Sequence, residues 1–355
     1  MSGAAINRGH AAEKKRAAAV LAADVFLWCL LCALTVLGYI NLGAVRQYSS
    51  VSLRYSAPVS GQAAYDARRY SIAHTKDSPF WPVFWKEYIA TIKSEFITVK
   101  ADCIAFSGEA AMVWPAGYIT GAAPGVTDGV GCAVSEALAW RLWGSSDVVG
   151  MTLQVDETAR VVRGVFEGST EIALISFRDE DTSQSWNAVE LTGGPEDPLR
   201  EDAESFAATS GLGRPDSVLM PGPSTVAAAL SILPLLILLC YALALLAGLV
   251  RKHFSSVSSP VLFACIILFA AALPAILGIL PAWLIPTRWS DFSFWASLLE
   301  QASGGMREFL RAAPMSRDVE LRMLLSKQVV ISFAAICCSL SVCFRWHLNS
   351  KNHRG

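Results

Sequence analysis

The sequence has few charged residues and few histidines, and it lacks the short motifs that mark common enzymes. Only 17% of its 355 residues are charged and five are histidine, whereas 53% are hydrophobic. It contains no G-x-x-x-x-G-K-[ST] phosphate loop, no H-E-x-x-H metal motif and no G-x-S-x-G nucleophile turn. We therefore expect this chain to be no enzyme by itself, and to have no metal site, no cofactor of its own and no nucleic-acid partner.

Long apolar runs dominate the sequence. Crossing the hydrocarbon core of a bilayer takes about 20 apolar residues in a helix. Four runs qualify, at residues 17–45, 225–250, 260–285 and 328–344. The first could instead be a cleaved signal sequence, but it is longer than a signal core, and residues 39–42 offer no small-x-small cleavage site. We therefore expect a membrane protein with four transmembrane α-helices, the first of them a retained anchor.

The positions of the basic residues predict the orientation of these spans, because cytoplasmic segments are enriched in Lys and Arg. Four basic residues lie in segment 1–16, two in the short loop 251–259 and three in the tail 345–355, so both termini are expected to be cytoplasmic. Segment 46–222 then forms an extracytoplasmic domain, whose 14 basic and 23 acidic residues give a balance of −9. The loop 286–327 is also placed outside, although it carries six basic and five acidic residues.

A few polar or reactive residues within this layout have two interpretations. Asp24 lies in the first span and could serve transport, but its position near the basic segment 14–16 favours a carboxylate that reaches interfacial water or a cation. Seven of the nine cysteines fall in spans, which leaves Cys103 and Cys132 in the outer segment as a disulfide candidate. The alternative is that these two are separately buried free thiols.

The outer segment has mixed α and β signals. Ser60 can cap a helix that extends to about residue 70, and a strand-rich stretch follows. Alternating apolar residues at 151–155 and 161–165 predict a β-hairpin. Trp81, Trp85 and Trp114 could form an exposed ligand patch, although packing or membrane anchoring is the more common role of such residues.

The most regular passage is a short helix at residues 135–144. Ser135 can cap it, and Glu136 suits the positive end of the helix dipole. Leu138 and Leu142 share one face, and Gly144 can end the helix in a left-handed turn.

This passage and its continuation resemble a known family. Residues 132–144, 147–150, 152–153 and 161–166 are similar to the periplasmic core domain of MacB/FtsX-like ABC transporter permeases, which carry an S-E-x-L-A-x-x-L-F-G-x-x-D-x-V-G pattern followed by a hairpin. Trp143 stands where that pattern often has Phe. Upstream, Gly121, Pro124, Asp128 and Gly131 fit the entry to the same domain. The matching positions are interpreted as structural: Ser135, Glu136, Leu138, Leu142, Gly144, Asp147, Gly150 and Gly164.

The resemblance implies a function. It implies the permease subunit of an ABC transporter or mechanotransmission complex in a bacterial cell membrane, with ATP reaching it only through a cytosolic ABC ATPase partner. A second permease copy or paralogue, the lipid bilayer and an extracytoplasmic protein are further expected partners. Arg251, Lys252 and Phe254 are the candidates for contacting the ATPase, although any inner loop carries basic residues. The alternative is a membrane-anchored receptor or adaptor that retains the permease architecture without transport.

The outer loop 286–327 contains one further candidate element. Residues 295–312 predict an amphipathic helix at the membrane surface, interrupted by Gly304 and Gly305.

Overall fold

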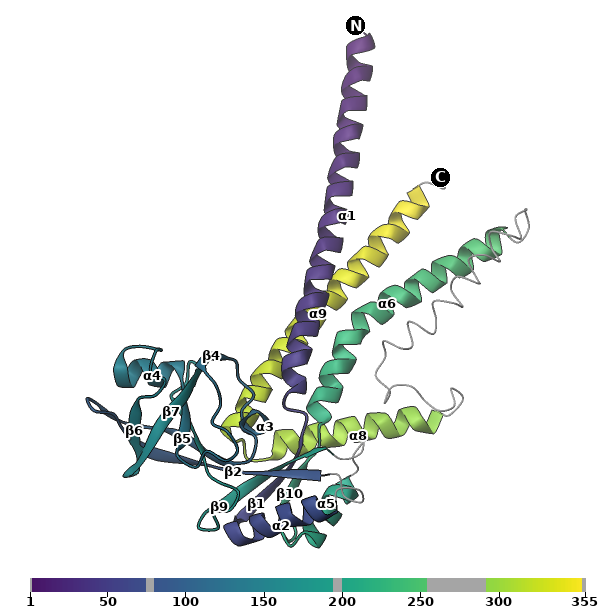
Figure 1. The fold of residues 1–355 in the computed structure, drawn as a ribbon. Coiled ribbons are helices and arrows are strands. Elements are labelled where there is room, and N and C mark those ends of the chain that lie inside the picture. Colours follow the sequence, from purple (N-terminus) through teal and green to yellow (C-terminus); the bar gives the residue numbers. More distant parts are fainter. Residues whose placement is uncertain (1, 75–79, 194–199, 254–291, 353–355) are drawn as a thin grey trace. The chain divides into compact units, whose positions relative to one another are not determined.

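A computed structural model describes residues 2–74, 80–193, 200–253 and 292–352 of the chain (Figure 1). The chain divides into two compact units. We call residues 1–44, 225–297 and 324–355 the helical unit, and residues 45–224 with 298–323 the inserted domain. Each unit is described by itself.

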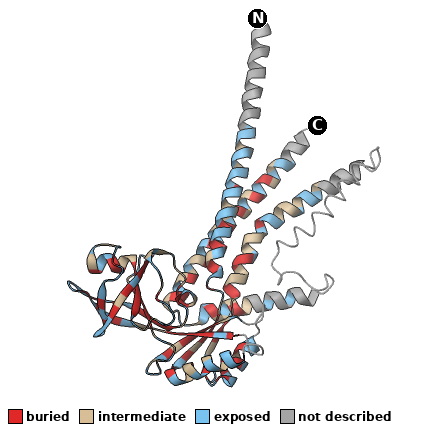
Figure 2. Ribbon diagram, in the orientation of Figure 1, coloured by how far each residue is buried: buried red, intermediate tan, exposed pale blue. Residues whose placement is uncertain are grey.

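The helical unit is built from long helices that match the predicted spans. α1 (Ser2–Arg46), α6 (Gly222–His253) and α9 (Ser316–Asn352) contain stretches long and apolar enough to cross a membrane, at Val20–Arg46, Gly222–Leu245 and Ser316–His347. Figure 2 shows exposed stretches along all three helices. Large apolar side chains such as Phe26 and Phe333 are among the exposed residues, as expected of surfaces that contact lipid. Three of the four predicted spans thus coincide with helices. The remaining one, the third along the chain at residues 260–285, lies outside the described residues.

The inserted domain combines one sheet with short helices. The strands are β1 (Val51–Ser60), β2 (Phe80–Lys93), β3 (Thr98–Ser107), β4 (Tyr118–Gly121), β5 (Gly131–Ser135), β6 (Thr152–Val155), β7 (Thr158–Phe166), β8 (Ile172–Ser176), β9 (Ser185–Gly193) and β10 (Ser217–Leu219). The helices are α2 (Gly61–Ala73), α3 (Ala110–Val113), α4 (Glu136–Trp143), α5 (Arg200–Thr209) and, from Leu298 onward, α8 (Phe292–Arg311). This content confirms the predicted α+β class for this part of the chain.

The order of the strands divides the sheet into two parts. The path runs β10-β1-β9-β2-β3-β8-β5-β7-β4, and β6 pairs with both β2 and β7. Strands β2, β3, β8, β5, β7 and β6 therefore close into a ring, while β9, β1 and β10 extend from β2 as an open sheet. Leu138 and Leu142 of α4 pack into the core formed with the ring strands. Residues of α2 and α5 share a second core with the open sheet.

Local sequence signals account for the elements that the family motif covers. Ser135 Oγ accepts a hydrogen bond from Leu138 N at 3.2 Å, and Gly144 adopts the left-handed conformation with φ 68°. The β6–β7 hairpin turns through Asp156 and Glu157, both with positive φ, as a two-residue hairpin loop requires. Ser60 likewise caps α2. These predictions are confirmed.

One expectation for the loop at 286–327 is wrong, because its predicted helix is not interrupted at Gly304 and Gly305 but continues through them as α8. The absence of a side chain at Gly305 allows close packing, since a Cβ on Gly222 would lie 2.9 Å from the backbone carbon of Gly305. α9 begins at Ser316, so the helix that contains the predicted span 328–344 starts twelve residues before that span. Its charged first turns are buried in protein, at Arg317 and Asp318, so low hydropathy there does not mark a loop.

Candidate functional site

The most unusual feature of the inserted domain is a buried carboxylate, Glu190 on β9. Its side chain has no solvent exposure. Strand pairing places Ser52 of β1 directly opposite, and the carboxylate accepts hydrogen bonds from Ser52 Oγ at 2.6 Å, Ser50 Oγ at 2.6 Å and Trp85 Nε1 at 3.0 Å. A buried charge is costly unless it is paired as well as hydrogen-bonded, so the surrounding cations matter.

Two arginines from distant parts of the chain supply that pairing. Arg317 Nη1 of α9 lies 3.5 Å from Glu190 Oε2, and Arg54 Nη2 of β1 lies 3.8 Å from Glu190 Oε1. Arg317 also donates to Ser50 Oγ at 2.9 Å, so this hydroxyl bridges the two charges. Each guanidinium lies over an aromatic ring, Arg54 over Trp85 and Arg317 over Tyr48.

The first turn of α9 is tied to the sheet by two more carboxylates. Asp318 Oδ1 accepts from Arg54 Nη2 at 2.9 Å, and its Oδ2 accepts from Met315 N at 3.1 Å. Glu87 of β2 accepts from the backbone N of Ser316 at 2.9 Å and from the hydroxyl of the same serine. We call Arg54, Glu87, Glu190, Arg317 and Asp318 the ionic junction.

Electrostatics within the junction keep the central carboxylate ionised. Burial alone would raise the pKa of Glu190, but Arg317, Arg54 and the Ser50 and Ser52 hydroxyls together hold that pKa below its ordinary value. Burial lowers the pKa of Arg54, and the nearby Glu190 and Asp318 oppose this effect. The charges therefore depend on one another, and removing one leaves another buried without its partner.

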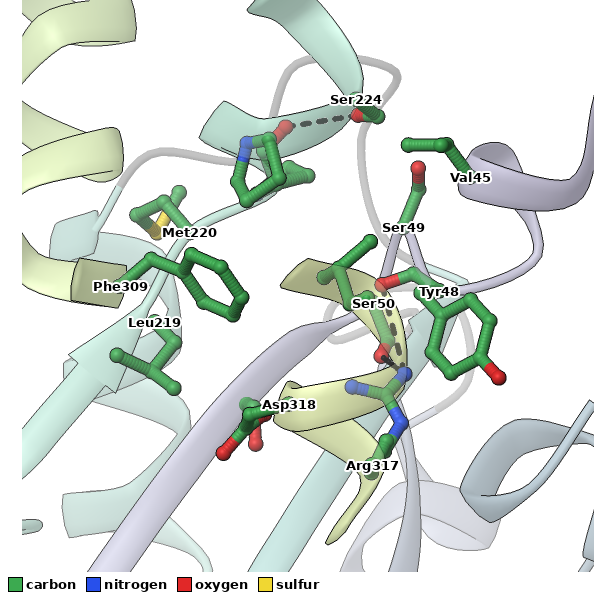
Figure 3. Close-up of a pocket in the computed structure, with 14 residues that line it drawn as sticks. Val45, Tyr48, Ser49, Ser50, Leu219, Met220, Ser224, Phe309, Arg317 and Asp318 are labelled. Atoms are coloured by element: carbon green, nitrogen blue, oxygen red, sulfur yellow. Dashed lines mark hydrogen bonds between the residues drawn. The ribbon is translucent and has the colours of Figure 1, made fainter. Parts of the chain in front are cut away.

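A small hollow adjoins the junction (Figure 3). It is lined by three passages of the chain: the segment after α1, the segment before α6, and the end of α8 with the start of α9. The lining residues are Val45, Tyr48, Ser49, Ser50, Ser52, Leu219, Met220, Pro221, Pro223, Ser224, Phe309, Arg317, Asp318 and Leu321. All of them belong to the inserted domain.

Further polar contacts fasten α8 in the same region. Arg322 Nη2 of α9 donates to the Phe309 carbonyl at 3.0 Å and to the Ala312 carbonyl at 3.3 Å, so α9 caps the end of α8. Glu308 of α8 pairs with Arg200 of α5. Among the described residues, no group of three or more His, Cys, Asp or Glu side chains could hold a metal ion.

The family-motif residues stabilise local structure through hydrogen bonds, or, at the glycines, by permitting a backbone conformation or a close approach that other residues would not. Ser135 Oγ accepts from Ile172 N at 3.1 Å in addition to capping α4, and Gly150 has φ 88°. A Cβ on Gly164 would lie 2.4 Å from the Ala122 carbonyl oxygen, so only glycine fits. Asp147 is part of a turn in which its N–H donates to Ser145 Oγ at 3.0 Å. These contacts agree with the structural interpretation of the motif.

The upstream part of the motif has an equally local explanation. Asp128 accepts hydrogen bonds from Val130 N at 3.1 Å, Gly131 N at 2.8 Å and Arg163 Nε at 2.7 Å. Burial raises the pKa of Asp128, but these bonds outweigh it and leave the pKa below its ordinary value. The carboxylate thus joins the loop before β5 to strand β7.

The predicted disulfide is not formed. Cys103 and Cys132 are both free and buried. Cys103 pairs with Ala173 of β8 and Cys132 with Ile175 of β8, so a whole strand separates them. Two strand spacings amount to about 10 Å, beyond the Cα separation of about 4.4–6.8 Å that a disulfide needs. The alternative interpretation, two buried free thiols, is the one that the structure supports.

The other candidate sites fare differently. Arg251 and Lys252 lie in the last turns of α6, and Phe254 lies outside the described residues, so their proposed contact with an ATPase stays a prediction. Of the two interpretations of the three tryptophans, the exposed ligand patch is wrong, because Trp85 and Trp114 are buried and only Trp81 of the three is exposed. Trp85 instead serves the junction as a hydrogen-bond donor to Glu190.

No family model matches this chain, and no curated protein matches it. Among solved structures, it is similar to the extracellular domain of the noncanonic ABC-type transporter YknZ from Gram-positive bacteria, with TM-score 0.39 and 11% identity over 48% of this chain and 97% of that one.

Two further solved structures are similar. The periplasmic region of MacB from Actinobacillus actinomycetemcomitans gives TM-score 0.40 and 9% identity over 50% of this chain and 92% of that one. A domain of a protein assigned as a permease from Porphyromonas gingivalis gives TM-score 0.36 and 17% identity over 48% and 86%.

Proposed function

We propose that this chain is the permease-type subunit of an ABC transporter or mechanotransmission complex in a bacterial cell membrane. In this proposal a separate cytosolic ATPase binds ATP, and the spans carry the resulting motion to the inserted domain, which lies outside the cell. The partners proposed with it are that ATPase, a second copy or paralogue of the permease, the surrounding bilayer and an extracytoplasmic protein.

This proposal rests on the segments of the inserted domain that lead to and from the long helices, and on the contacts that fix these segments in place. The segments that follow α1, precede α6 and begin α9 meet around one hollow, and buried charges fix the last of them to the sheet. A domain that only captures a ligand needs no more than a flexible tether. A domain that must follow the spans needs stiff connections, because a slack linker would absorb the displacement.

The proposed contact with the ATPase is at the inner end of α6. Arg251 and Lys252 offer positive charge there, and Phe254, two residues after Lys252, is apolar. Aromatic and Arg side chains are the residues that most often dominate protein interfaces. These three residues are the candidates whose removal should weaken ATPase binding.

A membrane-anchored receptor or adaptor remains the rival proposal. It shares the architecture, and it differs in having no ATPase partner. The two proposals therefore separate on a binding measurement.

The test is affinity purification of the tagged full chain from native membranes, with mass spectrometry and an ATPase assay on the eluate. We expect a cytosolic ABC ATPase to be recovered with the wild type and lost with Arg251→Ala combined with Phe254→Ala. A matched control removes the same kinds of side chain on the other predicted side of the membrane, with Leu310→Ala combined with Arg311→Ala, and should retain the ATPase. Recovery of no ATPase, under conditions that preserve a known transporter complex, would favour the receptor or adaptor.

A further inference from the structure

The helical unit contains a regular contact between its first and last helices. Asp24 Oδ1 of α1 accepts a hydrogen bond from Arg345 Nε of α9 at 2.6 Å. At the other end, Asn41 Nδ2 of α1 donates to Gln328 Oε1 of α9 at 2.9 Å. Asp24 thus has a defined cationic partner on a neighbouring helix.

The spacing of these contacts shows that the two helices pack antiparallel in one register. From Asp24 to Asn41 is 17 residues along α1, and from Gln328 to Arg345 is 17 residues along α9. Between them, a Cβ on Gly38 would lie 3.5 Å from Ile331 Cγ2, and this pair keeps the same register. At a rise of about 1.5 Å per residue the contact is about 25 Å long, close to the thickness of the hydrocarbon core.

Burial follows a heptad-like pattern along the same contact. On α1, Leu31, Gly38 and Asn41 are buried, whereas the adjacent Tyr39 and Ile40 are 70% and 64% exposed. On α9, Val330 and Phe333 are each 68% exposed, whereas the buried residues between positions 328 and 345 are Gln328, Ser332, Ala335, Ser339 and Val342. Spacings of three and four residues along both helices are typical of a coiled-coil seam.

We infer that α1 and α9 form one antiparallel pair whose register is set by a polar contact at each end of the seam. Apolar residues alone would tolerate a slip by one heptad, because the seam repeats every seven residues. A slip in one direction would move Asp24 from Arg345 to Cys338, and a slip in the other direction would move Asp24 to Asn352 and bring Gly38 level with Cys338; either slip would separate Asn41 from Gln328. A polar side chain left without its partner in hydrocarbon is unfavourable, so the two polar pairs exclude the slipped arrangements.

The contact between Asn41 and Gln328 also reaches α6. Gln328 Nε2 donates to Ser231 Oγ of α6 at 2.8 Å and to Ser332 Oγ at 3.1 Å. One fully buried amide therefore joins all three long helices that the structure describes. The assignment gives Asp24 the role of a register-setting residue, and it does not depend on an ATPase partner.

Cysteine crosslinking in native membranes tests the register with the full chain. Cys338 is kept and the other native cysteines are replaced by alanine. Leu31→Cys, which lies level with Cys338 on the seam, should crosslink with it several-fold more than Gly38→Cys, which would meet Cys338 only after a slip of one heptad. Two further pairs are made with Cys338 also replaced. Gly38→Cys should crosslink with Ile331→Cys. Tyr39→Cys and Val330→Cys are level with each other but point away from the seam, so this pair should not crosslink.

Charge exchange tests the role of the ion pair. Asp24→Arg alone and Arg345→Asp alone each place like charges together and should lower the Leu31→Cys to Cys338 crosslink several-fold, and the combined exchange should restore it. Equal crosslinking of the level and slipped pairs, or of the off-seam pair, would overturn the register. If the single reversals leave the crosslink unchanged, or if the exchange fails to restore it, Asp24 and Arg345 do not set the register. Should a single reversal prevent accumulation of the protein, the cysteine pairs in the unreversed chain still decide the register.

Discussion

Replacing Arg317 by methionine should destabilise the inserted domain strongly, although the side chain is far from any predicted binding residue. Arg317→Met preserves much of the volume of the side chain and removes its charge. It leaves the carboxylate of Glu190 fully buried, with Arg54 at 3.8 Å as its remaining cation. It also removes the hydrogen bond to Ser50 Oγ and the contact with the ring of Tyr48.

The size of the effect can be estimated from the burial of the pair. Breaking a buried ion pair by removing one partner costs about 3–5 kcal/mol. We expect the lower end, about 3 kcal/mol, because Arg54 and three hydrogen-bond donors still stabilise the carboxylate. For a domain of this size such a loss lowers the unfolding midpoint by roughly 6–12 °C.

Thermal unfolding of the purified full chain in detergent measures this shift. Intrinsic fluorescence is a suitable signal, because Trp85 and Trp186 are fully buried in the inserted domain. Arg200→Met is the matched control: Arg200, Glu204 and Glu308 are each about two-fifths exposed, so losing both surface pairs should cost no more than about 1 kcal/mol. If Arg317→Met lowers the midpoint no more than Arg200→Met does, the ionic junction does not hold the domain together as we argue.

Four other predictions concern individual side chains of the inserted domain. Ser135→Ala should cost about 1–2 kcal/mol of unfolding free energy, because it removes the acceptor of two backbone N–H groups; Ser135→Thr should restore most of it in the same unfolding assay. Gly164→Ala should cost more than about 2 kcal/mol, because its Cβ would overlap the Ala122 carbonyl oxygen, and an unchanged midpoint would refute that contact. Because the pKa of Glu190 is lowered in the folded protein, its ionised carboxylate should stabilise the fold above its ordinary pKa of 4.5. This stability should be lost as the pH falls through the lower folded pKa, so Glu190→Gln should make the free energy of unfolding depend less on pH in the acid range. Cys103 and Cys132, whose pKa values burial raises to about 12, should resist alkylation until the protein unfolds and then react fully without reductant.

Local structure was predictable from the sequence where neighbouring residues determine it. The helix that begins after Ser135 and ends at Gly144 needs only a cap, an apolar face and a left-handed terminus, and all three can be read within ten residues. The hairpin at Asp156 and Glu157 is similarly local. Such features depend on short-range hydrogen bonds and backbone conformation, which residue type restricts directly.

The ionic junction could not be predicted in the same way, because its members are far apart in the sequence. Glu190 is surrounded by apolar residues in its strand, and Arg317 and Asp318 fall in a charged segment that suggested a solvent-exposed loop. Only the pairing of β1 with β9, and the packing of α9 against them, brings these charges together. An isolated Glu within an apolar strand was the one available signal.

Strand order also explains the failed disulfide prediction. The sequence shows that Cys103 and Cys132 share a domain, but it does not show that β8 lies between their strands. The register of α1 against α9 was hidden for a related reason: apolar residues surround both helices, so hydropathy alone does not reveal which face is the seam. The polar residues Asp24, Asn41, Gln328 and Arg345 mark it only once their pairing is known.

The central claim is that ATP-driven motion reaches the inserted domain through its stiff chain connections. Hydrogen–deuterium exchange on the full chain purified with its ATPase, with and without a non-hydrolysable ATP analogue, tests it most directly. We predict that the analogue changes amide protection in residues 45–53 and 309–321, where the junction and the hollow lie, and that Arg317→Met reduces this response without loss of the ATPase. An unchanged exchange pattern in a complex that binds the analogue would contradict the claim.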